Sequence, residues 1–171
     1  MKKLSIKKYV LLSAIIVIGI VLDQVSKILT VNFIPFRESI PIIKNFFSLT
    51  YIVNYGAAWG MLDNARWVFI SISTVAIIAM LIYLYLGFAQ NTLYEVSLAI
   101  IISGGIGNMI DRLGRGYVVD MLSADFIDFP VFNVADSFVC VGAGMLILAL
   151  VLDIVKESKA AKEKKNDSDG N

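Results

Sequence analysis

The chain has 171 residues, 58% of them hydrophobic, and its mean hydropathy is +0.78. This composition is more apolar than that of a soluble domain and indicates an integral membrane protein. The charges nearly balance, with 15 Lys and Arg against 14 Asp and Glu, and no basic stripe with interleaved aromatic residues is present, so we expect no nucleic-acid partner.

The residue types that are missing narrow the chemistry further. The chain has no His, which excludes Ser-His-Asp and Cys-His hydrolysis as well as His-based zinc sites. Its one cysteine, Cys140, lies inside an apolar run and has no imidazole to activate it. We therefore expect no metal and no cofactor, and any catalysis must come from Asp, Glu, Lys, Tyr or Ser side chains.

Four apolar runs predict four transmembrane helices, because about 20 helical residues cross the hydrocarbon core of a bilayer. The predicted spans cover residues 9–29, 67–88, 94–113 and 133–153. The first run follows basic residues, as in a signal peptide, but no small-residue cleavage site comes after it, so we interpret it as a retained helix. Residues 1–157 then form one membrane domain, and the tail 158–171, in which Lys alternates with Glu and Asp, is predicted to be disordered.

A short β-structure is predicted between the first two spans. Residues 46–53 are rich in aromatic and β-branched side chains, which favour a strand, and residues 54–60 are small and turn-like. The sequence thus predicts an all-α membrane protein with four transmembrane helices and a small extracytoplasmic β-structure on the membrane surface.

The distribution of basic residues predicts the orientation in the membrane. With four spans, both termini lie on the same side. Four Lys residues precede the first span and five follow the last, against six Lys and Arg residues on the opposite side. Because basic residues concentrate in cytoplasmic segments, we expect both termini in the cytoplasm and the loop before the fourth span at the extracytoplasmic face.

Asp23 and Lys27 are spaced i,i+4 near the end of the first span, so their side chains share one face of the helix. One interpretation is an ion pair at the helix end, with Lys27 extended to the membrane interface. The other is that Asp23 supports a functional site from behind. A Ser-Lys peptidase built on Ser26 and Lys27 is not expected, because adjacent residues on a helix point in different directions.

Three polar residues, Asn108, Asp111 and Arg112, share one face of the third span at i, i+3 and i+4. Three glycines within 104–107 precede them and let a second helix or a substrate approach closely. The alternative is plain helix packing, with a buried contact from Asp111 to Arg112 or to a Lys. Ionisable residues this close to hydrocarbon are costly and often mark functional sites.

Asn133 and Asp136 stand at i, i+3 where the fourth span begins, a pattern typical of a helix cap. Capping alone does not account for Asp120, which precedes a loop that can fold back and bring Asp120 and Asp136 together. On the sequence alone, Asp125 or Asp128 in that loop could replace Asp120 as the partner, although such loop acids are more often solvated.

Two neighbouring aspartates form a complete catalytic pair, because they cannot both ionise comfortably and therefore share a proton. The ionised member takes a proton from a water molecule, which attacks a carbonyl carbon. The protonated member hydrogen-bonds the carbonyl oxygen, and a proton later goes to the leaving amine. This aspartic peptidase chemistry needs no His, Cys or metal, and at a membrane edge it suits a peptide bond just outside a lipid-embedded segment.

Five motifs, in order along nearly the whole chain, together resemble the bacterial lipoprotein signal peptidases, also called signal peptidase II. The motifs are DQVSK (23–27), NYGAAWG (54–60), GGIGNMIDR (104–112), VVD (118–120) and FNVADS (132–137). The resemblance implies a four-helix aspartic peptidase of the bacterial plasma membrane. Its substrate would be a prolipoprotein, cut directly before a Cys that carries diacylglycerol. The resemblance also implies contact with membrane lipid and inhibition by globomycin-type cyclic peptides.

The same resemblance implies roles for individual residues. The catalytic pair falls on Asp120 and Asp136. Positions that surround the substrate or support the pair fall on Asn54, Gly56, Asn108, Asp111, Arg112 and Asn133. Asp23 and Lys27 fall on positions associated with structure more than with chemistry.

The alternative function is a small proton-coupled transporter or channel, in which Asp23, Asp111 and Asp136 line a path. That function predicts acidic residues spread through the depth of the membrane, whereas the sequence concentrates them at the outer ends of the spans. A non-catalytic membrane scaffold would leave the combination of Asp120 and Asp136 unexplained.

Overall fold

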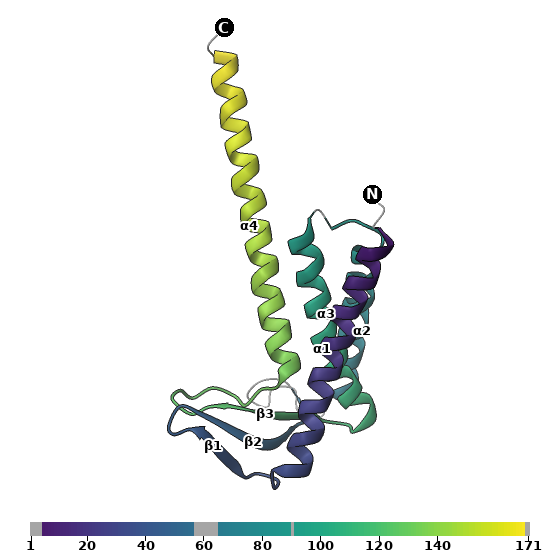
Figure 1. Ribbon diagram of the computed structural model, residues 1–171, viewed down its shortest axis with the longest axis vertical. Helices are drawn as coiled ribbons and strands as arrows, with labels where there is room; N and C mark the ends of the chain where they lie inside the picture. The colour runs from purple at the N-terminus through teal and green to yellow at the C-terminus, as the bar shows by residue number, and fades with distance from the viewer. Residues whose placement is uncertain (1–4, 57–64, 90, 170–171) are drawn as a thin grey trace.

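Four helices and one three-stranded sheet make up the protein, and the structure, a computed structural model, describes residues 5–56, 65–89 and 91–169 (Figure 1). In chain order the elements are α1 (Ile6–Phe33), β1 (Ser39–Ile43), β2 (Phe47–Asn54), α2 (Arg66–Tyr85), α3 (Thr92–Gly114), β3 (Val118–Ala124) and α4 (Val134–Asp169). All four helices are long and apolar enough to cross a membrane. The predicted fold class, four membrane helices with a small β-structure, is confirmed.

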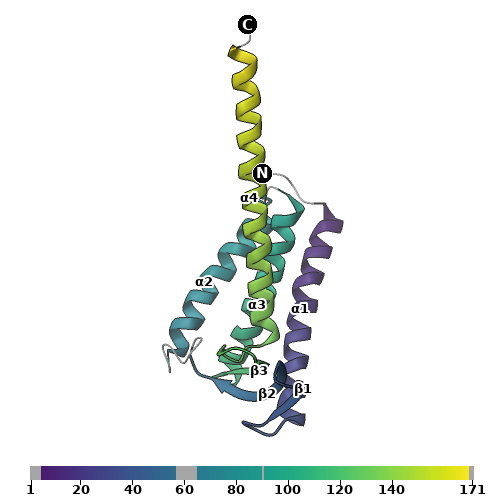
Figure 2. The same cartoon turned by 90° about the vertical axis from the view of Figure 1, so that its left-hand side faces the viewer.

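The helix α3 lies at the centre of the bundle and packs against α1, α2 and α4. Small residues permit the close approach: a β-carbon added to Gly19 of α1 would lie 2.5 Å from Ser103 Oγ, and one added to Gly142 of α4 would lie 2.9 Å from the carbonyl oxygen of Ser97. The helix α2 also packs on α3, but it diverges from α4 toward the sheet end of the bundle (Figure 2). Residues of α2, α3 and α4 line a cavity in this region.

Along α1, one stripe of residues is buried and the rest of the helix surface is apolar and exposed. The stripe recurs every three or four residues, as expected for a helix that packs on one side and faces lipid on the others. Its members are Leu12, Ile16, Gly19, Asp23, Lys27 and Thr30. The stripe changes from apolar to charged toward the sheet, so the charged part of α1 points into the protein at the sheet end.

The sheet lies across one end of the bundle, and the first residues of α1 lie at the opposite end together with the far end of α4 (Figure 1). Its strands are antiparallel in the order β1, β2, β3. An irregularity in register between Leu49 and Ile52 separates the outer part of the β2–β3 ladder from the part that pairs Asn54 with Val118. Beyond β3 the chain returns, and Phe132 forms a bridge with Leu122, which positions the start of α4 beside β3.

The C-terminal tail differs from the sequence-based expectation. Residues 158–171 are predicted to be disordered, whereas α4 continues without a break to Asp169. Residues 159–165 are Lys, Ala and one Glu, which are strong helix formers, and the segment extends an existing helix, so no new nucleation is required. Alternating charge in this tail is therefore compatible with a continued helix.

Candidate functional site

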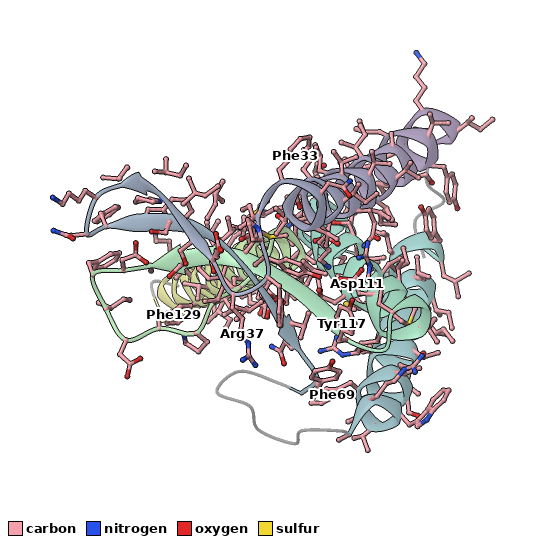
Figure 3. All side chains as sticks on the ribbon, turned by 90° about the horizontal axis from the view of Figure 1, so that it is seen from below. Phe33, Arg37, Phe69, Asp111, Tyr117 and Phe129 are labelled. Carbon is pink, nitrogen blue, oxygen red and sulfur yellow. The ribbon has the colours of Figure 1, made fainter. Side chains whose placement is uncertain are left out.

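A cavity of about 570 Å³ opens at the sheet end of the bundle, between α2, α3, α4 and β3. Figure 3 looks at this end, with Phe69 on the side of α2 and Phe129 in the loop that follows β3. The polar side chains that line the cavity are Asn54, Ser73, Asn108, Arg112, Asp120, Asp136 and Ser137. Its apolar part is formed mainly by Phe69, Gly105, Val139, Cys140 and the segment Phe129, Pro130, Val131 and Phe132.

Asp120 comes from β3 and is almost completely buried, with 1% of its surface exposed. Its carboxylate accepts hydrogen bonds from Asn54 Nδ2 at 3.0 Å and from Asn133 Nδ2 at 2.7 Å. Burial raises the pKa of Asp120 to about 6, and the nearby negative charge of Asp136 adds to the increase. Asp120 therefore keeps a proton to a higher pH than an ordinary aspartate does.

Asp136 comes from the first turn of α4 and is half-buried at the cavity wall. Its carboxylate accepts hydrogen bonds from Asn108 Nδ2 at 2.8 Å and from the backbone N–H of Asn133 at 3.2 Å. In return, the backbone N–H of Asp136 donates to Asn133 Oδ1 at 2.9 Å. The two residues thus form the expected cap of α4, and the same cap fixes the carboxylate toward the cavity.

Asn133 links the two aspartates and is itself fully buried. Its Nδ2 donates to Asp120 and also to Asn108 Oδ1, the latter at 3.1 Å, while its backbone N–H donates to Asp136. One residue therefore binds both carboxylates, and its amide and backbone geometry fixes where they lie relative to each other.

Behind the cavity, Lys27 is fully buried, with none of its surface exposed. Its Nζ lies 2.9 Å from Asp23 Oδ2, 3.1 Å from Asp111 Oδ2 and 3.0 Å from Asn108 Oδ1. The interpretation in which Lys27 extends to the membrane interface is therefore wrong. The ion pair between Asp23 and Lys27 is present, and Asp23 Oδ1 also accepts a hydrogen bond at 2.9 Å from the backbone N–H of Ala135, next to Asp136.

Asp111 and Arg112 are neighbours on α3, but their side chains contact different parts of the protein. Asp111 is buried, lies 3.6 Å from Arg115 Nε and accepts a hydrogen bond at 3.1 Å from the backbone N–H of Val119, so it ties α3 to β3. Arg112 donates to the carbonyl oxygen of Gly56 at 3.2 Å, and its guanidinium lies 4.9 Å from the centroid of the Phe69 ring at the cavity wall. Arg112 therefore faces the cavity, whereas Asp111 makes the kind of buried contact with a Lys that helix packing alone predicts.

The two loop acids lie away from the cavity. Asp125 accepts hydrogen bonds from the hydroxyl groups of Ser48 and Ser123, which lower the pKa of its carboxyl, and Asp128 is exposed. Ser26 donates to the carbonyl oxygen of Asp23 instead of facing Lys27. Of the three candidate partners for Asp136, only Asp120 lines the cavity among the residues that the structure describes.

Several lining residues carry no signal in the sequence. Phe69, Val139 and Cys140 lie within apolar spans, where nothing distinguishes a cavity wall from a lipid-facing surface. The motif at 54–60 is described only as far as Gly56, and its residues 57–60 lie outside the described part of the chain. Within the described residues, no three His, Cys, Asp or Glu side chains are grouped so as to hold a metal ion.

The family model for signal peptidase (SPase) II matches residues 15–152. A lipoprotein signal peptidase of Enterococcus faecalis is 45% identical over 159 residues, which cover 92% of this chain and 94% of that protein. A lipoprotein signal peptidase of Halothermothrix orenii is 48% identical over 136 residues, covering 80% and 92%.

Two solved structures agree with these matches in fold. A bacterial membrane enzyme determined by the in meso method at 2.3 Å superposes with a TM-score of 0.81 at 32% sequence identity, over 90% of this chain and 93% of that one. A second one, determined by the same method at 1.9 Å, has a TM-score of 0.76 at 32% identity, over 87% and 96%.

Proposed function

The chain belongs to the signal peptidase II family, and from this premise we propose that it is an aspartic endopeptidase that removes signal peptides from diacylglyceryl-modified prolipoproteins. The observation that carries the proposal is that Asp120 and Asp136 line one cavity and are joined through Asn133. The family assignment does not favour the transporter or channel alternative. A transporter path would also need acidic residues through the depth of the membrane. However, α2 has no acidic residue, and the acidic residues of α1, α3 and the membrane part of α4 stand toward the helix ends.

We assign different starting roles to the two aspartates. Asp120 is the protonated member, because burial and the charge of Asp136 raise its pKa. Asp136 is the ionised member, because it stands at the positive end of the α4 dipole and accepts two hydrogen bonds from N–H groups. A water molecule between the two carboxyl groups is then activated by Asp136.

The proposed reaction proceeds through a tetrahedral diol. Asp136 takes a proton from water as the water oxygen bonds to the carbonyl carbon, and Asp120 gives its proton to the carbonyl oxygen. As the carbon–nitrogen bond breaks, Asp136 passes its proton to the leaving nitrogen and a hydroxyl of the diol returns a proton to Asp120. The products are a carboxyl group on the signal peptide and a free amino group on the Cys, and the pair is regenerated.

The shape of the cavity supports a substrate held partly in lipid. The polar pair stands at the sheet end, and the cavity continues between the diverging helices α2 and α4 past Gly105, Val139 and Cys140. Burying acyl chains there would contribute about 0.8 kcal/mol per CH₂ group, and the same contacts would position the bond before the Cys. Arg112 and Asn54 stand beside the pair and are proposed to contact the peptide backbone.

A cleavage assay with matched substrates tests this proposal. Purified protein is incubated with a precursor peptide whose Cys carries diacylglycerol and with the same peptide lacking the lipid. We expect one cut directly before the modified Cys. The peptide without the lipid should be cut at a rate lower by a factor of about 10² or more, because its carbonyl is then poorly positioned. Equal cleavage of both peptides would contradict lipid recognition, and no cleavage of either would contradict the proposed function.

The proposed orientation places the cavity at the extracytoplasmic face and both termini in the cytoplasm. In a Cys140→Ser background, a membrane-impermeant thiol reagent should label Asp128→Cys on intact cells, because Asp128 is exposed at the sheet end. It should label Lys159→Cys, on the far part of α4, only after permeabilisation. The reverse labelling pattern would place the pair on the cytoplasmic side and exclude this substrate.

A further inference from the structure

We propose that Lys27 is a positioning residue for the catalytic pair, because its ammonium group fixes which end of the Asn108 amide faces Asp136. The inference rests on the proposed function of Asp120 and Asp136. It extends that function to a residue of α1 whose described hydrogen bonds and ion pairs reach neither of the two carboxylates.

The Lys27 ammonium has three N–H donors, and the structure provides three acceptors. Two are carboxylate oxygens, from Asp23 at 2.9 Å and Asp111 at 3.1 Å, and the third is Asn108 Oδ1 at 3.0 Å. An ammonium group can donate but cannot accept. The end of the Asn108 amide that faces Lys27 must therefore be its oxygen.

This constraint determines what Asn108 offers to the site. With Oδ1 facing Lys27, the NH₂ group points the other way and donates to Asp136 Oδ1 at 2.8 Å. Asn133 Nδ2 reinforces the arrangement by donating to the same Asn108 oxygen at 3.1 Å. If the amide turned over, Asp136 would face an oxygen and would lose a donor that stabilises its ionised form.

Charge balance alone does not require the third contact. Asp23 also accepts from the backbone of Ala135 and from Gln24, and Asp111 also lies beside Arg115 and accepts from the backbone of Val119. A Lys that served only to neutralise these two carboxylates would need no contact with a neutral amide. Of the three contacts, the one with Asn108 connects Lys27 to Asp136, because the other end of the same amide donates to the Asp136 carboxylate.

The charged groups that act on Asp136 include Arg112 of α3 and Asp120 of β3. Arg112 of α3 is attracted to Asp136 and Asp120, and Lys27 of α1 acts on Asp120 at longer range. Among the described residues near Asp136, Asn108 and the backbone of Asn133 are the groups that donate hydrogen bonds to its carboxylate. Losing the Asn108 donor should therefore slow turnover by about 10-fold or more, which is part of the roughly 10²-fold that misplacing a reacting group by about 1 Å can cost.

A double-mutant cycle tests the inference. All four proteins carry Asp23→Asn, so that Lys27→Met does not leave the Asp23 carboxylate buried without a positive partner. Asp111, the other carboxylate beside Lys27, still has Arg115 nearby. The cycle compares Asp23→Asn alone with the further changes Lys27→Met, Asn108→Ala, and both together. We measure kcat and KM on the diacylglyceryl-modified precursor, and the thermal unfolding midpoint of each protein in detergent.

We expect Lys27→Met to lower kcat about 10-fold or more while Asn108 is present, with KM changed less than about 2-fold, and to cause no further loss once Asn108→Ala is in place. A purely structural role for Lys27 would lower the unfolding midpoint without this dependence on Asn108. Independent losses in kcat would overturn the inference. Failure of the wild-type protein to cut the precursor would instead contradict the proposed function itself.

A second variant tests the same inference with Lys27 and Asp23 intact. Asn108→Asp keeps an acceptor for Lys27 and for Asn133 Nδ2, but it cannot donate to Asp136. We expect a loss in kcat at least as large as that of Asn108→Ala in the wild-type background. Turnover by Asn108→Asp within about 2-fold of the wild type would overturn the inference even if the Lys27→Met proteins do not fold, since a change of this size is small beside the 10-fold loss expected from misplacement.

Discussion

Gly104 in α3 lies directly against the backbone carbonyl oxygen of Ala135 in α4, where a β-carbon would overlap that oxygen. Ala135 also donates its N–H to Asp23 and immediately precedes Asp136. The missing side chain at position 104 therefore sets the distance between α3 and α4 at the level of the proposed catalytic pair, Asp120 and Asp136.

This contact predicts the effect of the smallest possible substitution. Gly104→Ala should push α4 away from α3, lower stability by about 1–3 kcal/mol through overpacking, and slow turnover because Asn108 and Asp136 are drawn apart. Gly144→Ala on α4 is the matched control, since within the described residues no atom outside the local backbone of α4 lies within 4 Å of the added carbon. Thermal unfolding in detergent and precursor cleavage are measured for both. Equal behaviour of the two variants would contradict the role assigned to the contact.

The catalytic pair gives the second prediction. Asp120→Asn and Asp136→Asn should each abolish detectable cleavage while the protein still folds in the membrane, because each change removes the acid or the base. The double variant should be about as inactive as either single one, since the two residues act as a unit. Asp128→Asn is the control, because its side chain is exposed and lies outside the cavity. Near-normal cleavage by either single variant would move the catalytic role to another residue.

The raised pKa of Asp120 gives a prediction for the pH dependence. Since Asp120 is proposed to hold a proton at the start of the reaction and its pKa lies at about 6, kcat/KM should fall about 10-fold per unit as pH rises above that value. Between the ordinary pKa of 3.8 and about 6, the folded protein binds more protons than the unfolded chain at this residue. The contribution of Asp120 to stability should therefore increase as pH falls through this window. A profile of kcat/KM that stays flat from about pH 5 to 8 would contradict the assignment of the proton to Asp120.

The fold was largely predictable because its strongest signals are local. Four apolar runs of sufficient length predict four membrane helices, and the aromatic and β-branched run at 46–53 predicts the strand that the structure contains as β2 (Phe47–Asn54). The tail was mistaken because alternating charge was taken as a sign of disorder, although its residue types favour a helix that is already formed. β1 and β3 were not predicted as separate strands, because each is formed by pairing with β2 and has only a weak pattern of its own.

The site was predictable only in part, for a different reason. Polar residues near hydrocarbon are conspicuous, so Asp120, Asp136, Asn108 and Arg112 could be identified from their positions in the sequence. The partners of Lys27 could not, because the contact with Asn108 joins residues 81 positions apart and depends on how α1 packs on α3. The lining of the cavity by Val139 and similar residues also follows from packing, and the spacing of apolar residues within a span does not reveal it.

The last prediction uses Cys140 to test whether the substrate occupies the space between α2 and α4. Cys140 is exposed and lines the apolar part of the cavity, on the same helix as Asp136. A membrane-permeant maleimide should therefore label it and block cleavage, because the added group fills the path that the acyl chains are proposed to take.

Bound diacylglyceryl-modified precursor, used with the inactive Asp136→Asn protein, should slow the labelling of Cys140, whereas the unlipidated precursor should not. The Cys140→Ser protein controls for reaction at other groups and should keep its activity in the presence of the reagent. Full cleavage by the labelled wild-type protein would show that the substrate reaches the catalytic pair by another route.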